Sequence, residues 1–258
     1  MNQLEKIRRI IFTGLAFALF GFGCIVLSLL VLPLQRVIYQ NSEQRKKLAR
    51  KTVHLGFRWF MWVAQSLKLC TVSVEQAQQY KNMRGQVVLA NHPCLIDVVL
   101  LISLIPNADC VVKAHLFKNP FIRGVINCTG YITNSDPEGL ILDCEKSLVS
   151  GNNLIIFPEG TRSDPEQTFF SFQRGAANII LRTGAPFKLF KLSVTPSTLT
   201  KSDKWYDVPP ERFVLSLSNM PVSIDDEVFR EMSPMAGARA LTKRLEKIYT
   251  EELFQNVA

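Results

Sequence analysis

The feature that most constrains this chain is a run of 23 residues without a charged side chain, Ile10–Leu32. A helix of about 20 apolar residues is long enough to cross the hydrocarbon core of a bilayer. The glycines within the run are common in membrane helices. A cleaved signal peptide is the competing interpretation, but its apolar region is only about 7–15 residues long. We therefore expect residues 1–35 to form a retained membrane anchor, as a transmembrane or membrane-interfacial helix.

Basic residues flank this run on both sides. Three precede it and six follow it, namely Lys6, Arg8 and Arg9, then Arg36, Arg45, Lys46, Lys47, Arg50 and Lys51. Because lysine and arginine are enriched on the cytoplasmic side of membranes, the excess predicts that the body of the protein faces the cytoplasm. A single-anchor chain of this size suits a bacterial inner membrane. A re-entrant or interfacial hairpin stays open as an alternative.

Residues 36–69 are expected to form an amphipathic, aromatic-rich helix at the membrane interface. Between Glu43 and Leu69 the apolar residues recur at nearly helical spacing, as Val53, Phe57, Met61, Ala64 and Leu67. Trp59, Phe60 and Trp62 make this segment unusually aromatic. A core helix with a few exposed aromatic side chains is an equally good interpretation.

The remaining residues, 70–258, predict one α/β domain with a mixed, largely parallel sheet flanked by helices. Short β-rich runs occur at Cys70–Val74, Gln86–Ala90, Asp109–Val112, Tyr131–Thr133, Asn153–Phe157, Phe187–Val194 and Arg212–Ser218. Helical patterns separate several of them, at Asp97–Leu104, Leu140–Val149 and Ala176–Thr183. Ser233-Pro234 opens a last amphipathic helix.

The overall composition excludes several classes of protein. With 47% hydrophobic and 10% aromatic residues, the chain is too apolar to be mainly disordered. The net charge of +8 favours anionic partners, but no nucleic-acid recognition motif is present. The six cysteines are scattered without a CxxC pair or a Cys/His cluster, so neither a metal site nor a disulfide framework is expected.

One candidate site lies where a buried strand runs into Asn91-His92-Pro93, with Asp97 in the first turn of the following helix. A side chain in a first helical turn tilts back toward the N-terminus, so the Asp97 carboxylate can meet the His92 imidazole. Imidazole titrates near neutrality and can remove a proton from a hydroxyl group, while a carboxylate fixes its tautomer. The alternative is a strand-end histidine that only bonds to the backbone.

A second candidate site follows another buried strand, in the sequence Phe157-Pro158-Glu159-Gly160-Thr161-Arg162-Ser163. Open α/β sheets bind ligands beyond the carboxyl ends of their strands. The Arg162 guanidinium matches phosphate or carboxylate, and Gly160 lets backbone donors approach an anion. A simple Glu159–Arg162 salt bridge in a turn is the alternative. The later Phe172–Ala176 run supplies another basic corner through Arg174.

The ordered pair of motifs, Asn91-His92 with Asp97 and then Phe157–Ser163 about 60 residues later, resembles the glycerolipid acyltransferases of the 1-acylglycerol-3-phosphate acyltransferase type. The resemblance extends from about residue 84 to 200. It implies that His92 is the general base on an acceptor hydroxyl and Asp97 its orienting partner. It also implies that the substrates contact Asn91, Phe157, Pro158, Glu159, Gly160, Thr161, Arg162 and Arg174.

The same resemblance implies a membrane-bound O-acyltransferase of phospholipid or related lipid biosynthesis. A fatty-acyl group would pass from an acyl-CoA or acyl-ACP (acyl carrier protein) thioester to the free hydroxyl of a lysolipid. The thioester is already activated, so neither a bound cofactor nor a metal is expected. The expected partners are the lysolipid acceptor, the acyl donor and the bilayer, but not nucleic acid.

Three positions depart from the family pattern. In the run 130–136, Asp136 stands where an arginine that contacts acceptor phosphate is expected, and Asp136 would repel phosphate. Leu189 stands at the usual fourth-motif proline, and Cys94 replaces a hydroxyl residue. Lysophosphatidic acid (1-acylglycerol-3-phosphate) is the default acceptor, and a specialised non-phosphatidic lysolipid is the alternative. Arg123 or Arg174 could replace the arginine that is missing at position 136.

Two other functions stay open beside acyl transfer. A non-catalytic membrane protein could keep the fold to bind lipid, although such a protein does not need a base beside a carboxylate. A lipid hydrolase could use His92 to activate water, although the sequence has no Gly-x-Ser-x-Gly elbow.

Overall fold

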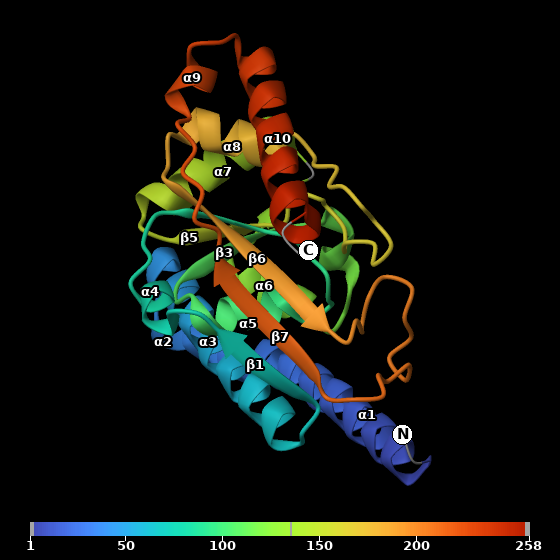
Figure 1. The fold of residues 1–258 in the computed structure, drawn as a ribbon. Coiled ribbons are helices and arrows are strands. Elements are labelled where there is room, and N and C mark those ends of the chain that lie inside the picture. Colours follow the sequence, from blue (N-terminus) through green and yellow to red (C-terminus); the bar gives the residue numbers. More distant parts are fainter. Residues whose placement is uncertain (1–2, 135, 256–258) are drawn as a thin grey trace.

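The protein is built on one seven-stranded sheet, seen in a computed structural model that describes residues 3–134 and 136–255 (Figure 1). The strand order is β1-β7-β6-β2-β5-β3-β4. All neighbouring pairs are parallel except β6 and β7, which are antiparallel. The strands are β1 Cys70–Val74, β2 Val87–Ala90, β3 Ala108–Val112, β4 Ile132–Thr133, β5 Asn153–Ile156, β6 Phe187–Thr195 and β7 Phe213–Asn219. The predicted mixed, largely parallel sheet is confirmed.

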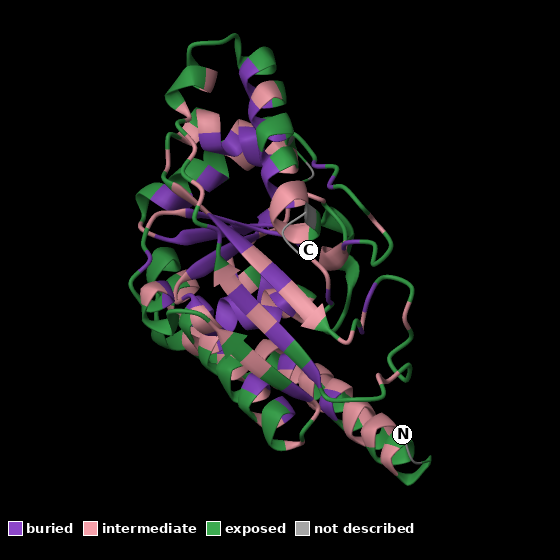
Figure 2. Cartoon of the chain, in the orientation of Figure 1, coloured by how far each residue is buried: buried purple, intermediate pink, exposed green. Residues whose placement is uncertain are grey.

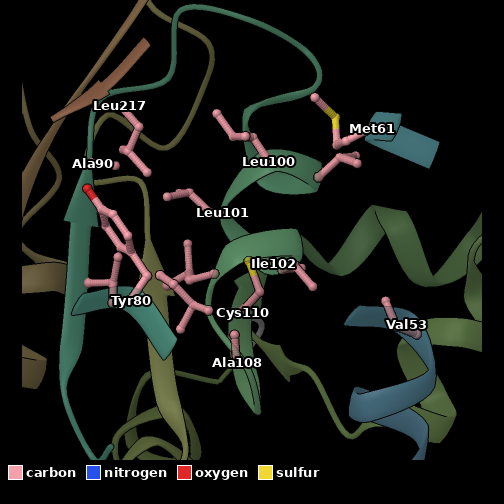
Figure 3. Packing of buried hydrophobic residues seen from close by; sticks show 14 of the residues in the cluster. Val53, Met61, Tyr80, Ala90, Leu100, Leu101, Ile102, Ala108, Cys110 and Leu217 are labelled. Carbon is pink, nitrogen blue, oxygen red and sulfur yellow. The ribbon is translucent and has the colours of Figure 1, made fainter. Parts of the chain in front are cut away.

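Helices cover both faces of this sheet. Successive residues of each central strand point to opposite faces, so apolar strands need a cover of helices on each side. Val88 of β2 packs into a cluster with α3, α5 and α6, whereas Val87 and Leu89 pack into a second cluster with α7, α8 and α10. Figure 3 shows the first cluster, where Leu100, Leu101 and Ile102 of α5 meet the side chains of α3 and the sheet. The helices named so far are α3 Ser42–Ser66, α5 Asp97–Leu104, α6 Arg123–Thr129, α7 Pro137–Val149, α8 Gly175–Thr183 and α10 Pro234–Thr250.

The chain begins with a long apolar helix that extends beyond the domain (Figure 1). Helix α1, Gln3–Val26, continues through a π-helical turn, Leu27–Val31, into α2, Leu32–Ile38. Within the part of the chain that the structure describes, this 36-residue helix is long and apolar enough to cross a membrane. Figure 2 shows how little of its surface is buried. This exposed apolar surface is compatible with membrane association.

Helix α1 nevertheless packs along the domain over much of its length. The Phe20 ring lies 5.8 Å from the Phe57 ring and 5.3 Å from the Phe60 ring, both of α3. Further toward the N-terminus, the space beside Gly14 is filled by the Trp205 side chain. The α1 helix is therefore part of the packed body as well as its most apolar exposed element.

Helix α3 combines the two interpretations of the sequence. Val53, Met61 and other residues of one face are buried, while Trp59 and Trp62 are exposed on the other (Figure 2). The expectation that Arg50 belongs to the charged membrane flank is wrong, because Arg50 is 5% exposed and forms an ion pair with Asp109. Helical periodicity placed it correctly on the helix but did not reveal its partner.

The short helices are the elements that the sequence did not predict. They are α4 Ala77–Lys81, the 3-10 helix Ala114–Lys118, α6 and α9 Glu227–Arg230, followed at the end of the chain by a π-helical turn, Glu251–Gln255. Segments of four to seven residues are too short to show a 3.6-residue period.

Candidate functional site

The two predicted motifs lie side by side because their strands are neighbours. Strand β2 leads into Asn91 and His92, and β5 leads into Phe157 and Glu159. The two strands are parallel, with Leu89 paired to Ile156, so both motifs leave the sheet at the same edge. Parallel strands thus bring together residues that are about 65 positions apart in the sequence.

The His92 and Asp97 side chains are in direct contact, as the sequence predicts. His92 Nδ1 lies 3.0 Å from Asp97 Oδ2, and the backbone N–H of Cys94 donates to the same oxygen at 2.7 Å. The turn at Pro93 brings the start of α5 back toward the end of β2. Because Nδ1 faces the carboxylate, the other ring nitrogen of His92, Nε2, remains for a substrate.

The Asp97 carboxylate lies in a strongly desolvated position. It is fully buried, and burial raises its pKa, while the hydrogen bonds from His92 and Cys94 N–H oppose that rise. Among the described residues, Asp97 Oδ1 is a buried oxygen without a hydrogen-bond partner. A proton on His92 is therefore the nearest charge that can compensate this carboxylate.

The aromatic ring of Phe157 holds the His92 imidazole from one face. The two ring centroids are 4.2 Å apart, with an angle of 22° between their planes. The imidazole is thus fixed by a carboxylate at its edge and by a stacked ring on its face. The His92 side chain is 18% exposed, and it lines the cavity described below.

Glu159 connects the second motif to the backbone of the first. Its Oε1 accepts hydrogen bonds from the His92 N–H at 2.9 Å and from the Ser163 hydroxyl at 2.8 Å. The Ser163 N–H donates to the His92 carbonyl at 2.7 Å. Burial raises the pKa of Glu159, and these hydrogen bonds oppose the rise. The carboxylate therefore positions the turn that carries His92.

Arg162 is held by a different segment, so the simple Glu159–Arg162 salt bridge is the wrong interpretation. One guanidinium nitrogen donates to the carbonyls of Leu199 at 3.0 Å and Thr200 at 2.5 Å. The Leu199 carbonyl also accepts the N–H of Leu95 at 3.1 Å. The segment after β6 is thus tied to both motifs. Gly160 has a φ of +67°, a left-handed conformation that glycine adopts without strain.

A cavity of about 680 Å³ adjoins His92. Most of its lining is apolar, and it reaches from the two motifs to α1 and α3, where Phe17, Phe20, Phe57 and Phe60 form part of the wall. The second motif contributes Phe157, Pro158, Gly160, Thr161 and Arg162 to the same lining. The second motif therefore adds the polar side chains of Thr161 and Arg162 to a lining that is mostly apolar.

Not every predicted site residue lines this cavity. Asn91 is 2% exposed, and its side-chain amide exchanges two 2.8 Å hydrogen bonds with the backbone of Leu192 in β6. Arg174 is exposed at the start of α8, beside the lining residues Gln173 and Gly175. Arg123 is exposed at the start of α6.

Asp136, in the position expected for an arginine, has a structural role. Its carboxylate accepts the N–H groups of Glu138 at 3.2 Å and Gly139 at 3.1 Å, and so caps α7. Ser135, in the same predicted motif, lies outside the described residues. Residues 1–2 of the predicted anchor and residues 256–258 of the predicted domain also lie outside them.

Several cavity residues were not singled out from the sequence. Lys113 and His115 follow β3, which is the neighbour of β5, and Lys201 follows β6, which is the neighbour of β2. Their position beyond the ends of parallel strands is the signal that could have identified them. The aromatic wall from α1 and α3 had no such signal, because it depends on how α1 docks onto the domain.

Comparisons with known proteins match this chain to acyltransferases. Residues 71–198 match the protein-family model described as Acyltransferase. A 1-acyl-sn-glycerol-3-phosphate acyltransferase of Helicobacter pylori is 30% identical over 132 residues, which cover 49% of this chain and 53% of that protein. One from Cocos nucifera is 27% identical over 154 residues, which cover 57% of this chain and 46% of that protein. The match therefore spans about half the length of these curated relatives.

The fold has a counterpart among solved structures. The crystal structure of PlsC from Thermotoga maritima, a 1-acyl-sn-glycerophosphate (LPA) acyltransferase, matches with a TM-score of 0.62. The match covers 95% of this chain and 97% of that chain at 20% sequence identity. At this level of identity the match shows that the fold is shared.

Proposed function

Because the chain belongs to the acyltransferase family, we propose that it transfers a fatty-acyl group from a thioester to the free hydroxyl of a lysolipid. The observation that carries this proposal is the His92–Asp97 pair at the edge of a large apolar cavity. The relatives named above support 1-acylglycerol-3-phosphate as the acceptor.

His92 and Asp97 supply the proton transfers of this reaction. Nε2 of His92 takes the proton of the acceptor hydroxyl as its oxygen attacks the thioester carbonyl. The tetrahedral intermediate then expels the thiolate, which takes the proton back from the imidazolium, so the histidine is regenerated. Asp97 holds the tautomer and stabilises the imidazolium. General-base catalysis of this kind contributes about 10²–10⁴-fold to the rate.

The apolar cavity supports the choice of a fatty-acyl substrate. Each methylene buried from water contributes about 0.8 kcal/mol to binding, so a long chain gains most of its affinity from such a wall. The aromatic residues of α1 and α3 would hold the chain, while the thioester or hydroxyl end lies beside His92. The proposal therefore makes α1 part of the substrate site as well as of the membrane anchor.

Cationic groups near the motifs support a phosphate-bearing acceptor. Arg162 lines the cavity together with Lys113 and Lys201. Asp136 is engaged as a helix cap, so these groups, rather than an arginine at position 136, would bind the phosphate.

The remaining features of the proposal concern donor and location. The donor would be acyl-CoA or acyl-ACP, with no bound cofactor and no metal, since the thioester supplies the activation. Residues 1–35 would anchor the protein, residues 36–69 would lie at the interface, and residues 70–258 would form the catalytic domain. The exposed apolar surface of α1 supports a membrane site of action, and the charge asymmetry of the sequence supports the cytoplasmic face of a bacterial inner membrane.

The test is turnover by the full chain reconstituted in vesicles, with acyl-CoA or acyl-ACP and a panel of lysolipids. Mass spectrometry would identify the products of the wild type, of His92→Ala and of His54→Gln. His54 is a matched control, because it bonds to the Ile102 carbonyl and does not line the cavity. We expect a new ester on a lysolipid with the wild type and the control, and its loss in His92→Ala.

Other outcomes of this experiment would overturn the proposal. Thioester consumption with release of free fatty acid alone would indicate a hydrolase. Absence of turnover with every pair of substrates would indicate a lipid-binding protein. An unchanged rate in His92→Ala would remove His92 as the base.

A further inference from the structure

We propose that the segment between β6 and β7, residues 196–212, is a second membrane contact, which inserts Trp205 and Tyr206 into the headgroup layer of a bilayer. This inference rests on the membrane site of action proposed above. It goes beyond the anchor, because the segment lies some 170 residues after α1 in the sequence and carries no apolar run.

The first observation is the exposure of two neighbouring aromatic rings. Trp205 is 48% exposed and Tyr206 is 42% exposed, and their ring centroids are 5.5 Å apart in an edge-to-face arrangement. The Lys204 ammonium lies 5.5 Å from the centroid of the Tyr206 ring. Trp and Tyr are enriched where a protein meets the membrane interface, since each combines an apolar ring with a polar group.

The second observation is that this segment is continuous with the apolar surface of α1. The Trp205 ring lies against Gly14, near the start of the uncharged run. Tyr206 and Val208 form a surface groove with Lys6 and Ile10 of the same helix. Figure 1 shows the orange loop between β6 and β7 on the side of the domain where the N-terminal half of α1 runs. A bilayer that covers the exposed apolar residues of α1 would therefore reach the two rings.

The third observation concerns the polar groups of the segment. Asp203 and Asp207 carry negative charge, but each carboxylate accepts a backbone N–H of the loop, from Thr200 and Lys204 respectively, at 2.9 Å. The carboxylates thus stabilise tight turns that hold the rings outward. Lys201 and Lys204 are exposed, and their long side chains can extend to lipid phosphates while their methylenes stay at the interface.

The segment also has a direct connection to the catalytic site. The carbonyls of Leu199 and Thr200 hold Arg162, and Lys201 lines the cavity next to His92. A loop fixed at the depth of the headgroups would therefore keep the cavity at the level where the hydroxyl of a lysolipid lies. Its expected function is to present the site to bilayer-embedded acceptors.

The test measures the depth of Trp205 by fluorescence in vesicles that contain brominated lipids. The reporter is the full chain with Trp59→Phe and Trp62→Phe, which leaves Trp205 as the one tryptophan. In a background with Trp205→Phe as well, Phe22→Trp on exposed α1 serves as the positive control. Phe169→Trp, exposed and next to Phe170 of the cluster on the opposite face of the sheet, serves as the negative control.

We expect the Trp205 signal to be quenched more strongly by bromines near the headgroup than by bromines at the chain ends. We expect Phe22→Trp to be quenched and Phe169→Trp to be unaffected. Quenching of Phe22→Trp without quenching of Trp205 would overturn the proposal, since the loop would then face water. Absence of quenching in both would overturn it together with the membrane site of action.

A kinetic measurement provides a second readout. Tyr206→Ser removes one exposed ring and keeps Trp205, the residue that contacts Gly14. We expect its apparent KM for a bilayer-embedded lysolipid to rise about three- to tenfold, the effect of losing part of one aromatic contact. Its rate on a short-chain, water-soluble lysolipid should match the wild type, which separates this proposal from a failure of acyl transfer itself. Equal KM values in vesicles would count against the loop as a membrane contact.

Discussion

The two ends of the central strands each carry a buried carboxylate with a basic partner, and the two pairs are built differently. Asp97 lies beyond the carboxyl end of β2, where it bonds to His92. Asp109 lies near the amino end of β3, where Arg50 Nη1 approaches its Oδ1 to 2.9 Å. The comparison sets a pair that we propose to be catalytic, at one end of the sheet, against a pair that serves packing at the other end.

The pair at the amino end has a permanent charge and a complete set of partners. Arg50 also donates to the Thr129 carbonyl and the Asn107 amide, and Asp109 accepts from Ser147 and Asn152. Both side chains are at most 5% exposed. Arginine stays protonated at any physiological pH, so this cluster can only hold α3, β3 and α7 together.

The pair at the carboxyl end is incomplete by contrast. Asp97 Oδ1 has no partner among the described residues, and the imidazole of His92 is open to the cavity on one side. Its basic member is an imidazole, which can accept a proton on the ring nitrogen that does not face Asp97. We infer that an open side and a proton-accepting partner distinguish the proposed catalytic pair from the structural one.

The largest effect is expected for Asp97→Asn. Asp97 Oδ2 bonds to both His92 Nδ1 and the Cys94 N–H, so the amide oxygen of the variant can take its place and keep the imidazole tautomer. The negative charge that stabilises the imidazolium is lost, so we expect kcat to fall about 10²–10⁴-fold, the contribution of general-base catalysis. Turnover in vesicles and urea unfolding in detergent would be measured together. A near-normal kcat would mean that Asp97 only stabilises the start of α5.

The opposite result is expected for Arg50→Met at the amino end. Removal of one partner leaves Asp109 buried and uncompensated, which costs about 3–5 kcal/mol in the free energy of unfolding. Folded molecules should retain wild-type kcat. Urea unfolding of the detergent-solubilised protein measures the stability, and the double variant Arg50→Met/Asp109→Asn should recover most of the loss, since no buried charge remains.

Lys47→Met is the matched control for this variant. Lys47 is an exposed basic residue of the same helix, and its replacement should change the free energy of unfolding by less than about 0.5 kcal/mol. A similar cost for both variants would mean that the ion pair with Asp109 is not the cause. A loss of kcat in folded Arg50→Met would break the distinction between the two ends of the sheet.

The sequence predicted the strands better than their arrangement. Its seven β-rich runs correspond to the seven strands to within a residue or so, because buried apolar runs between polar turns are a local signal. The contact of His92 with Asp97 was also predictable, since it depends only on a turn of five residues. The order of the strands, and the antiparallel pairing of β6 with β7, depend on packing of distant segments and had no local signal.

The same limit explains what the sequence missed in the site. The resemblance placed Glu159 at the substrate, but the bond of its carboxylate to the His92 backbone had no local signal, because the pairing of β2 with β5 creates that contact. Arg50 was counted as a membrane-flanking charge because its partner, Asp109, is 59 residues away. A residue's type and local period predict its helix or strand, whereas its role depends on neighbours that only the folded chain supplies.

A smaller effect on stability is expected at Asp136, an exposed carboxylate that belongs to neither pair. Asp136→Ala removes the cap of α7 and should lower the free energy of unfolding by about 0.5–2 kcal/mol, whereas Asp136→Ser keeps a capping oxygen and should cost little. Urea unfolding of the two variants would measure the difference. The same two variants test whether Asp136 also repels the acceptor phosphate. If it does, both variants should have the same KM for lysophosphatidic acid, and this KM should be lower than that of the wild type. Equal KM values in the wild type and both variants would mean that Asp136 acts only as a helix cap.

The smallest effect is expected for Glu159→Gln, and it tests whether a carboxylate at the catalytic end can have a structural role. Burial raises the pKa of Glu159 above its ordinary value of 4.5, so the folded protein holds this proton more tightly than the unfolded chain does. The stability of the wild type should therefore fall as pH rises from 4.5 through the raised pKa. The amide that replaces the carboxyl group has no proton to lose at these pH values, and its carbonyl can still accept from the His92 N–H and the Ser163 hydroxyl.

Urea midpoints of the wild type and Glu159→Gln should thus agree at acidic pH and diverge as pH rises, with the variant the more stable at neutral pH. Glu166→Gln, an exposed substitution in the same segment, should follow the wild type throughout. If the wild type instead gains stability over Glu159→Gln with rising pH, the Glu159 carboxylate is held in its charged form. It would then resemble Asp109, a paired structural charge, and the two ends of the sheet would differ only in the openness of the His92–Asp97 pair.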